Sequence, residues 1–282
     1  MRFWRWILPL FLLGLWAAGC TAAPAVVAVL PSPTLASTPT LAPTHTRTPT
    51  PTATPAPATP SLTHTLAVCS PLASFALAAL PNMVSNPYHP PQPGSDNPHQ
   101  GVDLTVLDPS SRIALTGNVV QAVLPGQVAL IMNDRFPYGS AVLIEISLVQ
   151  APADWWAPSG IPEPAPTLAP RSALTCPAFS QPLAMDETRR SVYVLYAHLQ
   201  SIEGLSLGQP VTCGQALGTV GMSGNALNPH VHVEVRAAPA GIQLSSMAHY
   251  DASASQDEMA AYCLWRVSGL FQLVDPLKFM LR

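Results

Sequence analysis

The chain has 282 residues, including 33 prolines, with 12 basic and 15 acidic residues and a formal net charge of −3 at pH 7. Lys278 is the single lysine, and no basic run is present. This balance excludes a typical nucleic-acid-binding protein, because phosphate backbones are bound by concentrated lysine and arginine. The length allows one or two domains, but the first quarter of the chain lacks the composition of a folded domain.

Residues 1–20 predict an export signal. Arg2 and Arg5 form a basic start, an apolar run follows, and small residues precede Cys20. The ending "LWAAGC" is similar to a bacterial lipoprotein cleavage box, in which Cys20 would be lipidated and would anchor the protein to a membrane. Ala17 stands where that box usually has leucine, so an ordinary secretory signal remains an alternative. Both readings export the protein, to the outer face of the cytoplasmic membrane or elsewhere in the cell envelope.

Residues 21–67 predict an extended, disordered linker, because their centre is nearly pure proline, threonine and alanine. At the rise of a polyproline II helix such a linker reaches on the order of 140 Å. Residues 68–282 then remain, about 215 residues, which is enough for one domain with a hydrophobic core. We expect this domain to be a monomer.

Four cysteines lie in this domain, and an even number in an exported protein favours disulfides. Four cysteines allow three pairings. We favour Cys69 with Cys263, which would join the two ends of the domain, and Cys176 with Cys213; free buried thiols are the alternative.

In chain order, short apolar or alternating runs separated by Gly, Pro, Asn and Asp predict a mainly β domain, an antiparallel sheet or sandwich with few peripheral helices. A Pro-rich insertion at about 150–190 is too long for a hairpin turn; it either lines a groove, with Trp155 and Trp156 as flat apolar surface, or packs as decoration. The expected strands are 118–123, 127–133, 140–149, 191–199, 216–221 and 230–236, and the expected helices are 71–81 and 255–271, the latter capped by Ser255.

The segment "NPHQGVDL" carries the first candidate site residues. In an extended chain, His99, Gly101 and Asp103 lie on one side, and the glycine leaves room for an ion to approach both outer side chains. Taken alone, a surface histidine and a turn aspartate explain this segment equally well.

The segment "SVYVLYAHL" carries the second. Alternation places His198 on the same face as Val194 and Tyr196. A buried core histidine with one hydrogen bond is the alternative.

The segment "HVHVEVR" carries the third. As a strand, it places His230, His232, Glu234 and Arg236 on one face and the valines on the other. The simplest interpretation of this polar face is a solvated surface on which Glu234 pairs with Arg236. Together, however, the three segments predict a catalytic zinc site, since imidazoles and one carboxylate supply three ligands and leave a fourth position for water. The two surplus histidines can act as acid and base or bind an oxyanion.

These residues also carry a family resemblance. "HQGVD", "YAHL" and "GNALNPHVHVEVR" resemble, in the same order, the HxGxD, YxHL and SGxSxGxHxHFEVR segments of the lysostaphin-type, or LytM-type, zinc metallopeptidases, which cut peptide bonds in peptidoglycan. The similarity runs from about Asn86 to Phe279. Val233 replaces the usual phenylalanine, and the loop before His230 lacks the usual Ser, Thr and Gly residues.

The resemblance implies an antiparallel sheet with a metal on the floor of a groove. It implies one zinc ion held by His99, Asp103 and His232, with His198 and His230 as catalytic residues, and hydrolysis of cell-wall cross-links or stem peptides. Glu234 stays without an assigned role. Two other functions share the fold, a non-catalytic wall-binding or amidase-activating module and a peptidase acting on an exported protein.

Overall fold

The computed structural model describes residues 67–148 and 174–281. The predicted export signal with Cys20, the linker up to residue 66, and Trp155 and Trp156 of the insertion lie outside the described residues. Within the described ranges, no helix is both long and apolar enough to cross a membrane.

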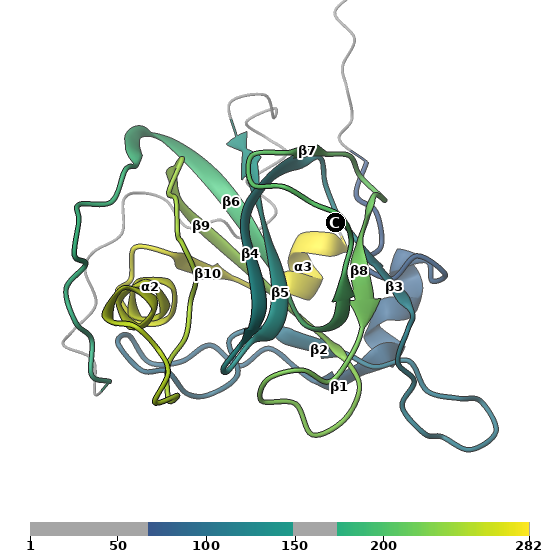
Figure 1. Ribbon diagram of the computed structural model, residues 1–282. Helices are drawn as coiled ribbons and strands as arrows, with labels where there is room; N and C mark the ends of the chain where they lie inside the picture. The colour runs from purple at the N-terminus through teal and green to yellow at the C-terminus, as the bar shows by residue number, and fades with distance from the viewer. Residues whose placement is uncertain (1–66, 149–173, 282) are drawn as a thin grey trace, which may run out of the picture. The chain divides into compact units, whose positions relative to one another are not determined.

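One antiparallel sheet of ten strands forms the framework, which confirms the predicted fold class (Figure 1). Its strands follow the order β1-β2-β9-β6-β5-β4-β7; β10 pairs with β9, and β8 pairs with both β6 and β3. The strands are β1 Val84–Asn86, β2 Val102–Leu104, β3 Val119–Gln121, β4 Gly126–Arg135, β5 Gly139–Ser147, β6 Asp186–Ile202, β7 Pro210–Val211, β8 Ala216–Val220, β9 Val231–Ala240 and β10 Gln272–Val274.

Two hydrophobic clusters cover the two faces of the central strands. The first contains the valines of β9 and packs under β3, β8, the 3₁₀ helix η1 (Leu77–Met83) and α3 (Pro276–Met280). The second contains Tyr193 and Leu195 of β6 and packs against Tyr262 and Trp265 of α2 (Gln256–Arg266). In Figure 1, α2 and the β3–β8 pair accordingly lie on opposite sides of the sheet. The alternation of β6 and β9 is therefore explained by two cores, not by one core and a solvated face.

All six predicted strands are present, although β6 and β9 are longer than predicted and β1, β2, β7 and β10 are additional. The α-helix predicted at 71–81 is wrong: Pro71 and Ala73 form backbone hydrogen bonds with β3, and the chain forms only the 3₁₀ helix η1 after them. The second helix is present as α2; the Ser255 side chain accepts from Glu258 N in a capping box. The five-residue α3 was too short to be recognised from periodicity.

The disulfide pairing that we favoured from sequence is wrong. The structure joins Cys69 to Cys213 and Cys176 to Cys263, with Cα–Cα distances of 5.6 and 5.8 Å. The reason is local: Cys69 N donates to the carbonyl of Val123, and Gly214, next to Cys213, donates to Ala122, so both cysteines border the same short segment. The spacing of cysteines along the chain does not indicate such a shared neighbour.

Candidate metal centre

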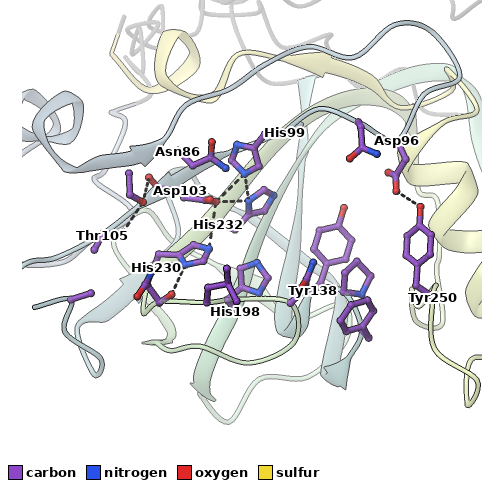
Figure 2. A pocket seen from close by; sticks show the side chains of 18 of the residues that line it. Asn86, Asp96, His99, Asp103, Thr105, Tyr138, His198, His230, His232 and Tyr250 are labelled. Atoms are coloured by element: carbon purple, nitrogen blue, oxygen red, sulfur yellow. Dashed lines mark hydrogen bonds and ion pairs between the residues drawn. The ribbon is translucent and has the colours of Figure 1, made fainter.

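Two antiparallel strands bring the predicted ligands together. In the register of β2 with β9, Asp103 lies opposite His232. Asp103 Oδ1 is 2.7 Å from His232 Nδ1 and 3.0 Å from His99 Nε2, and these two nitrogens are 3.0 Å apart. Figure 2 shows the imidazoles gathered around this carboxylate. Residues more than a hundred positions apart in the chain therefore present three donor atoms at one point, all within 4.8 Å of one another.

Gly101 is the small residue that this arrangement requires. A Cβ atom at Gly101 would lie 2.6 Å from His232 Cε1 and 2.6 Å from the carbonyl oxygen of Val233. No real side chain fits at such distances. We expected this glycine to leave room for an ion, but the ring of His232 and the backbone of Val233 occupy that space.

The outer nitrogen of each ligand histidine is held by an acceptor. His99 Nδ1–H donates to the carbonyl of Pro87 at 2.9 Å, and His232 Nε2–H donates to Glu234 Oε1 at 3.0 Å. In a neutral imidazole the inner nitrogen, Nε2 of His99 or Nδ1 of His232, then carries a lone pair. Both inner nitrogens, together with the Asp103 carboxylate, therefore direct lone pairs at the same small volume, an arrangement that favours a cation between them.

His198 lies on the opposite face of β6 from the one predicted. Val194, Tyr196 and Leu199 all belong to the first hydrophobic cluster, so the alternation of the strand shifts by one residue between Tyr196 and Leu199. His198 has a φ of 62°, and its N–H donates to Tyr138 O. This left-handed residue turns the imidazole toward the second face, where its ring centroid is 4.8 Å from His230 and 5.7 Å from His232.

His230 lies just before β9, and its Nε2 is 3.6 Å from Asp103 Oδ1. Its Nδ1–H donates to the carbonyl of Asn228 at 2.7 Å, while His198 Nδ1–H donates to the carbonyl of Ser223 at 2.8 Å. Both rings are thus held in the tautomer that keeps a lone pair on Nε2. The structure brings all five predicted site residues together, the two surplus histidines beside the three-atom cluster.

Burial and neighbouring charges set the protonation of these groups. Burial raises the pKa of Asp103, but hydrogen bonds with His232 and His99 outweigh it and hold that pKa well below its usual range. Burial lowers the pKa of His232, yet its bonds to Asp103 and Glu234 raise that pKa to about 9. For His198, burial and then the neighbouring His232 and His230 lower the pKa to about 3. Without a cation between the ligands, these neighbours thus favour a proton on His232, and a bound metal ion would take the place of that proton at Nδ1; the ring of His198 is neutral in either case.

Glu234 is fully buried, and five side chains donate to it. Oε1 accepts from His232, from the hydroxyl of Tyr138 and from Arg266, while Oε2 accepts from Arg236 and from the indole N–H of Trp265. The ion pair predicted between Glu234 and Arg236 is present at 2.6 Å, but both side chains are in the interior and not on a solvated surface.

Sequence reasoning missed the partners of Glu234 that come from elsewhere in the chain. Tyr138, Trp265 and Arg266 lie on segments that no local pattern connects with β9. A signal was available nonetheless: two charges within a strand of buried valines need buried partners, because an unpaired buried charge is costly.

A groove of about 1070 Å³ opens over these residues. Apolar side chains that are largely exposed border it, with Leu227 91%, Ile113 65% and Tyr250 57% accessible. Figure 2 places Tyr250, bonded to Asp96, away from the cluster of histidines within the same pocket. The histidines therefore lie in an open groove with exposed apolar borders.

The donor set fits a zinc ion. Two imidazole nitrogens and one carboxylate are ligands that zinc takes in catalytic sites, and three protein ligands leave a position for water. The outer nitrogen of each ligand histidine already donates to an acceptor, as metal-binding histidines usually do. His99, Asp103 and His232 are the residues that would hold the ion.

Comparison with known families gives one match. Residues 182–244 match the model of Peptidase family M23, a range that contains His198, His230 and His232 but neither His99 nor Asp103. The predicted resemblance to this peptidase family is confirmed over these residues. A comparison with curated proteins finds no match.

Among solved structures, a putative peptidase M23 from Pseudomonas aeruginosa is similar at 23% identity over 62% of this chain, with a TM-score of 0.30; the match spans 47% of that protein. The catalytic domain of the prophage-encoded M23 protein EnpA from Enterococcus faecalis matches at 20% identity, 56% of this chain and 82% of its own, TM-score 0.32. The catalytic domain of lysostaphin from Staphylococcus simulans matches at 18% identity over 59% of this chain and 87% of its own, with a TM-score of 0.31. At these identities and scores, nothing about activity follows from the three structures.

Proposed function

We propose that this protein is a zinc-dependent endopeptidase that hydrolyses peptide bonds of peptidoglycan. One observation carries the proposal: two imidazole lone pairs and the Asp103 carboxylate converge on one point in an open groove, with His198 and His230 beside them. The match of residues 182–244 to a peptidase family supports hydrolysis of peptide bonds as the reaction. The wall polymer as substrate rests on the family resemblance and on the predicted export.

His99, Asp103 and His232 would hold the ion. When bound, zinc supplies a Lewis acid that polarises a carbonyl group and lowers the pKa of water toward neutrality. Three ligands from the chain would leave a position on the ion for water.

His198 and His230 would handle protons. Each holds its proton on Nδ1 by donating to a backbone carbonyl, so Nε2 is free to accept a proton or hydrogen bond from water in the groove. Once protonated, the same Nε2–H can donate to the oxyanion of the tetrahedral intermediate or to the leaving amine. The low pKa of His198 keeps its ring neutral at the start of the cycle.

The location of the enzyme is part of the proposal. We propose export through residues 1–20, lipidation of Cys20, residues 21–67 as linker, and residues 68–282 as the peptidase domain. A linker of this length would allow a membrane-held enzyme to reach its polymer. Labelling with a radioactive fatty acid, compared between the native chain and Cys20→Ala, tests the anchor; equal labelling contradicts it.

The activity test uses the full chain and purified cell-wall sacculi. New amino termini are expected in the presence of zinc, none after treatment with a chelator, and renewed release when zinc is added back. A set of sacculi with different cross-links then identifies the bond that is cut. Absence of new amino termini under all conditions, with the protein folded, would contradict the proposal and favour the non-catalytic binding module; release from an exported protein alone would favour that substrate instead.

A further inference from the structure

Arg266 is the last residue of α2, and its side chain reaches the buried carboxylate behind the candidate metal ligands. Its Nη1 donates to Glu234 Oε1 at 2.7 Å. That oxygen also accepts from His232 Nε2. The guanidinium is 11% exposed and Glu234 is fully buried, so water screens this pair weakly.

The same guanidinium also holds the segment that precedes His99. Arg266 Nε donates to Asp96 Oδ1 at 2.5 Å, and Nη2 donates to the Asp96 carbonyl at 2.8 Å. Asp96 lies three residues before His99 in the chain. One side chain therefore bridges the two segments that carry the histidine ligands, β9 and the loop before β2, and does so with donors in the fixed geometry of a guanidinium.

Arg236 and Arg266 bind different carboxylate oxygens of Glu234. Arg236 binds Oε2 through Nε and Nη2, at 3.0 and 2.6 Å, and belongs to the same strand as Glu234. Arg266 binds Oε1, the oxygen that orients His232. Loss of Arg266 would remove a cationic donor from Oε1 and the link between that oxygen and Asp96, so the acceptor that orients the ring of His232 would be held less firmly.

We propose that Arg266 is a positioning residue of the metal centre: by holding Glu234 against His232 and Asp96 beside His99, its side chain raises the affinity of the three ligands for the metal. The inference rests on the proposed function, since it presumes that the three ligands bind zinc. It adds a part of the chain that the family match does not include, because α2 begins after residue 244.

A purely structural role for Arg266 would be to fix α2 to the sheet, and the chain offers a matched control for that role. Arg135 of β4 also joins α2 to the sheet, through two bonds of 2.8 Å to Glu258. Neither Arg135 nor Glu258 contacts one of the three ligands or a partner of a ligand in the described part of the chain. Removal of either arginine weakens the docking of α2, but only Arg266 acts on the ligands.

The experiment compares the full chain with Arg266→Met and Arg135→Met. The zinc Kd is measured by competition with a chromophoric chelator, and thermal unfolding is measured on the chelated proteins. We expect Arg266→Met to weaken zinc binding by about 10–100-fold. Arg135→Met should leave the Kd unchanged while lowering the Tm of the chelated protein.

Equal zinc Kd values for the native chain and Arg266→Met would overturn the inference, and so would an equal loss in both variants. If Arg266→Met does not fold, Arg266→Lys serves instead: it keeps one charge but cannot bridge Asp96 and Glu234 with fixed geometry, so we expect its Kd between those of the native chain and a ligand variant. A native Kd for Arg266→Lys would also overturn it. If the native chain itself binds no zinc, the proposed function has failed, a result distinct from either of these.

Discussion

The two faces of β9 are equally buried but are stabilised in different ways. Val231, Val233 and Val235 pack into the first hydrophobic cluster, where any well-fitting apolar group would serve. His232, Glu234 and Arg236 are buried to the same degree, yet every polar atom needs a specific partner from another segment. The difference teaches that alternation along a strand predicts which residues share a face, but not whether the polar face meets water or a set of buried partners. Substitutions on the two faces should therefore have separable effects.

The largest expected effect is on the polar face, at His232. Replacement of His232 by alanine removes one of the three metal-ligand atoms and the hydrogen bond that Glu234 Oε1 accepts from His232 Nε2. We expect zinc binding to be lost, with peptide release from sacculi at background. Zinc content by mass spectrometry and assays of new amino groups measure the two effects; a variant that retains full activity contradicts the ligand assignment.

The next effect concerns His198, one of the two site histidines outside the three-atom cluster. His198→Ala should lower the rate of hydrolysis by about 10²–10⁴-fold, because it removes a proton acceptor and donor. The zinc Kd should stay close to native, since His198 lies beside the three donors without being one of them. Rate and Kd are measured on the same preparation; a large loss of zinc binding would identify His198 as a ligand.

On the apolar face, Val233→Ala should act on stability alone. The side chain is fully buried, and its truncation should lower the free energy of unfolding by about 2 kcal/mol through lost burial and a residual cavity. Urea unfolding of the chelated protein measures this loss, and the zinc Kd of the folded variant should be native. A marked change in Kd would show that the two faces are not separable.

The smallest expected effect lies in the helix that covers the polar face. Ser255→Ala removes the side-chain half of the capping box of α2 and should cost about 1 kcal/mol of stability. Arg266, at the other end of α2, keeps its contacts. We expect native zinc affinity with a slightly lower Tm, measured by calorimetry; loss of affinity comparable to that of Arg266→Met would mean that any weakening of α2 acts on the centre.

Local periodicity predicted the strands, and chemical type together with the family resemblance predicted the grouping of the site residues. The predictions failed where an unusual backbone conformation or a contact between distant segments decides. The face of His198 was wrong, since a single residue with positive φ shifts the alternation. The disulfide partners were wrong, because both cysteines of one pair border the segment 121–123. The partners of Glu234 were missed, although its burial among valines required them.

The disulfide between Cys69 and Cys213 has a mechanical consequence. A force applied through the chain ahead of residue 67 enters the described fold next to Cys69, which is covalently bound to Cys213 between β7 and β8. Pulling the first residues away from the sheet then also pulls on Cys213 and does not only break the hydrogen bond to Val123. Neither cysteine lines the groove. A force from the preceding chain would therefore enter the fold at Cys69 and Cys213, at a distance along the chain from the histidines of the groove.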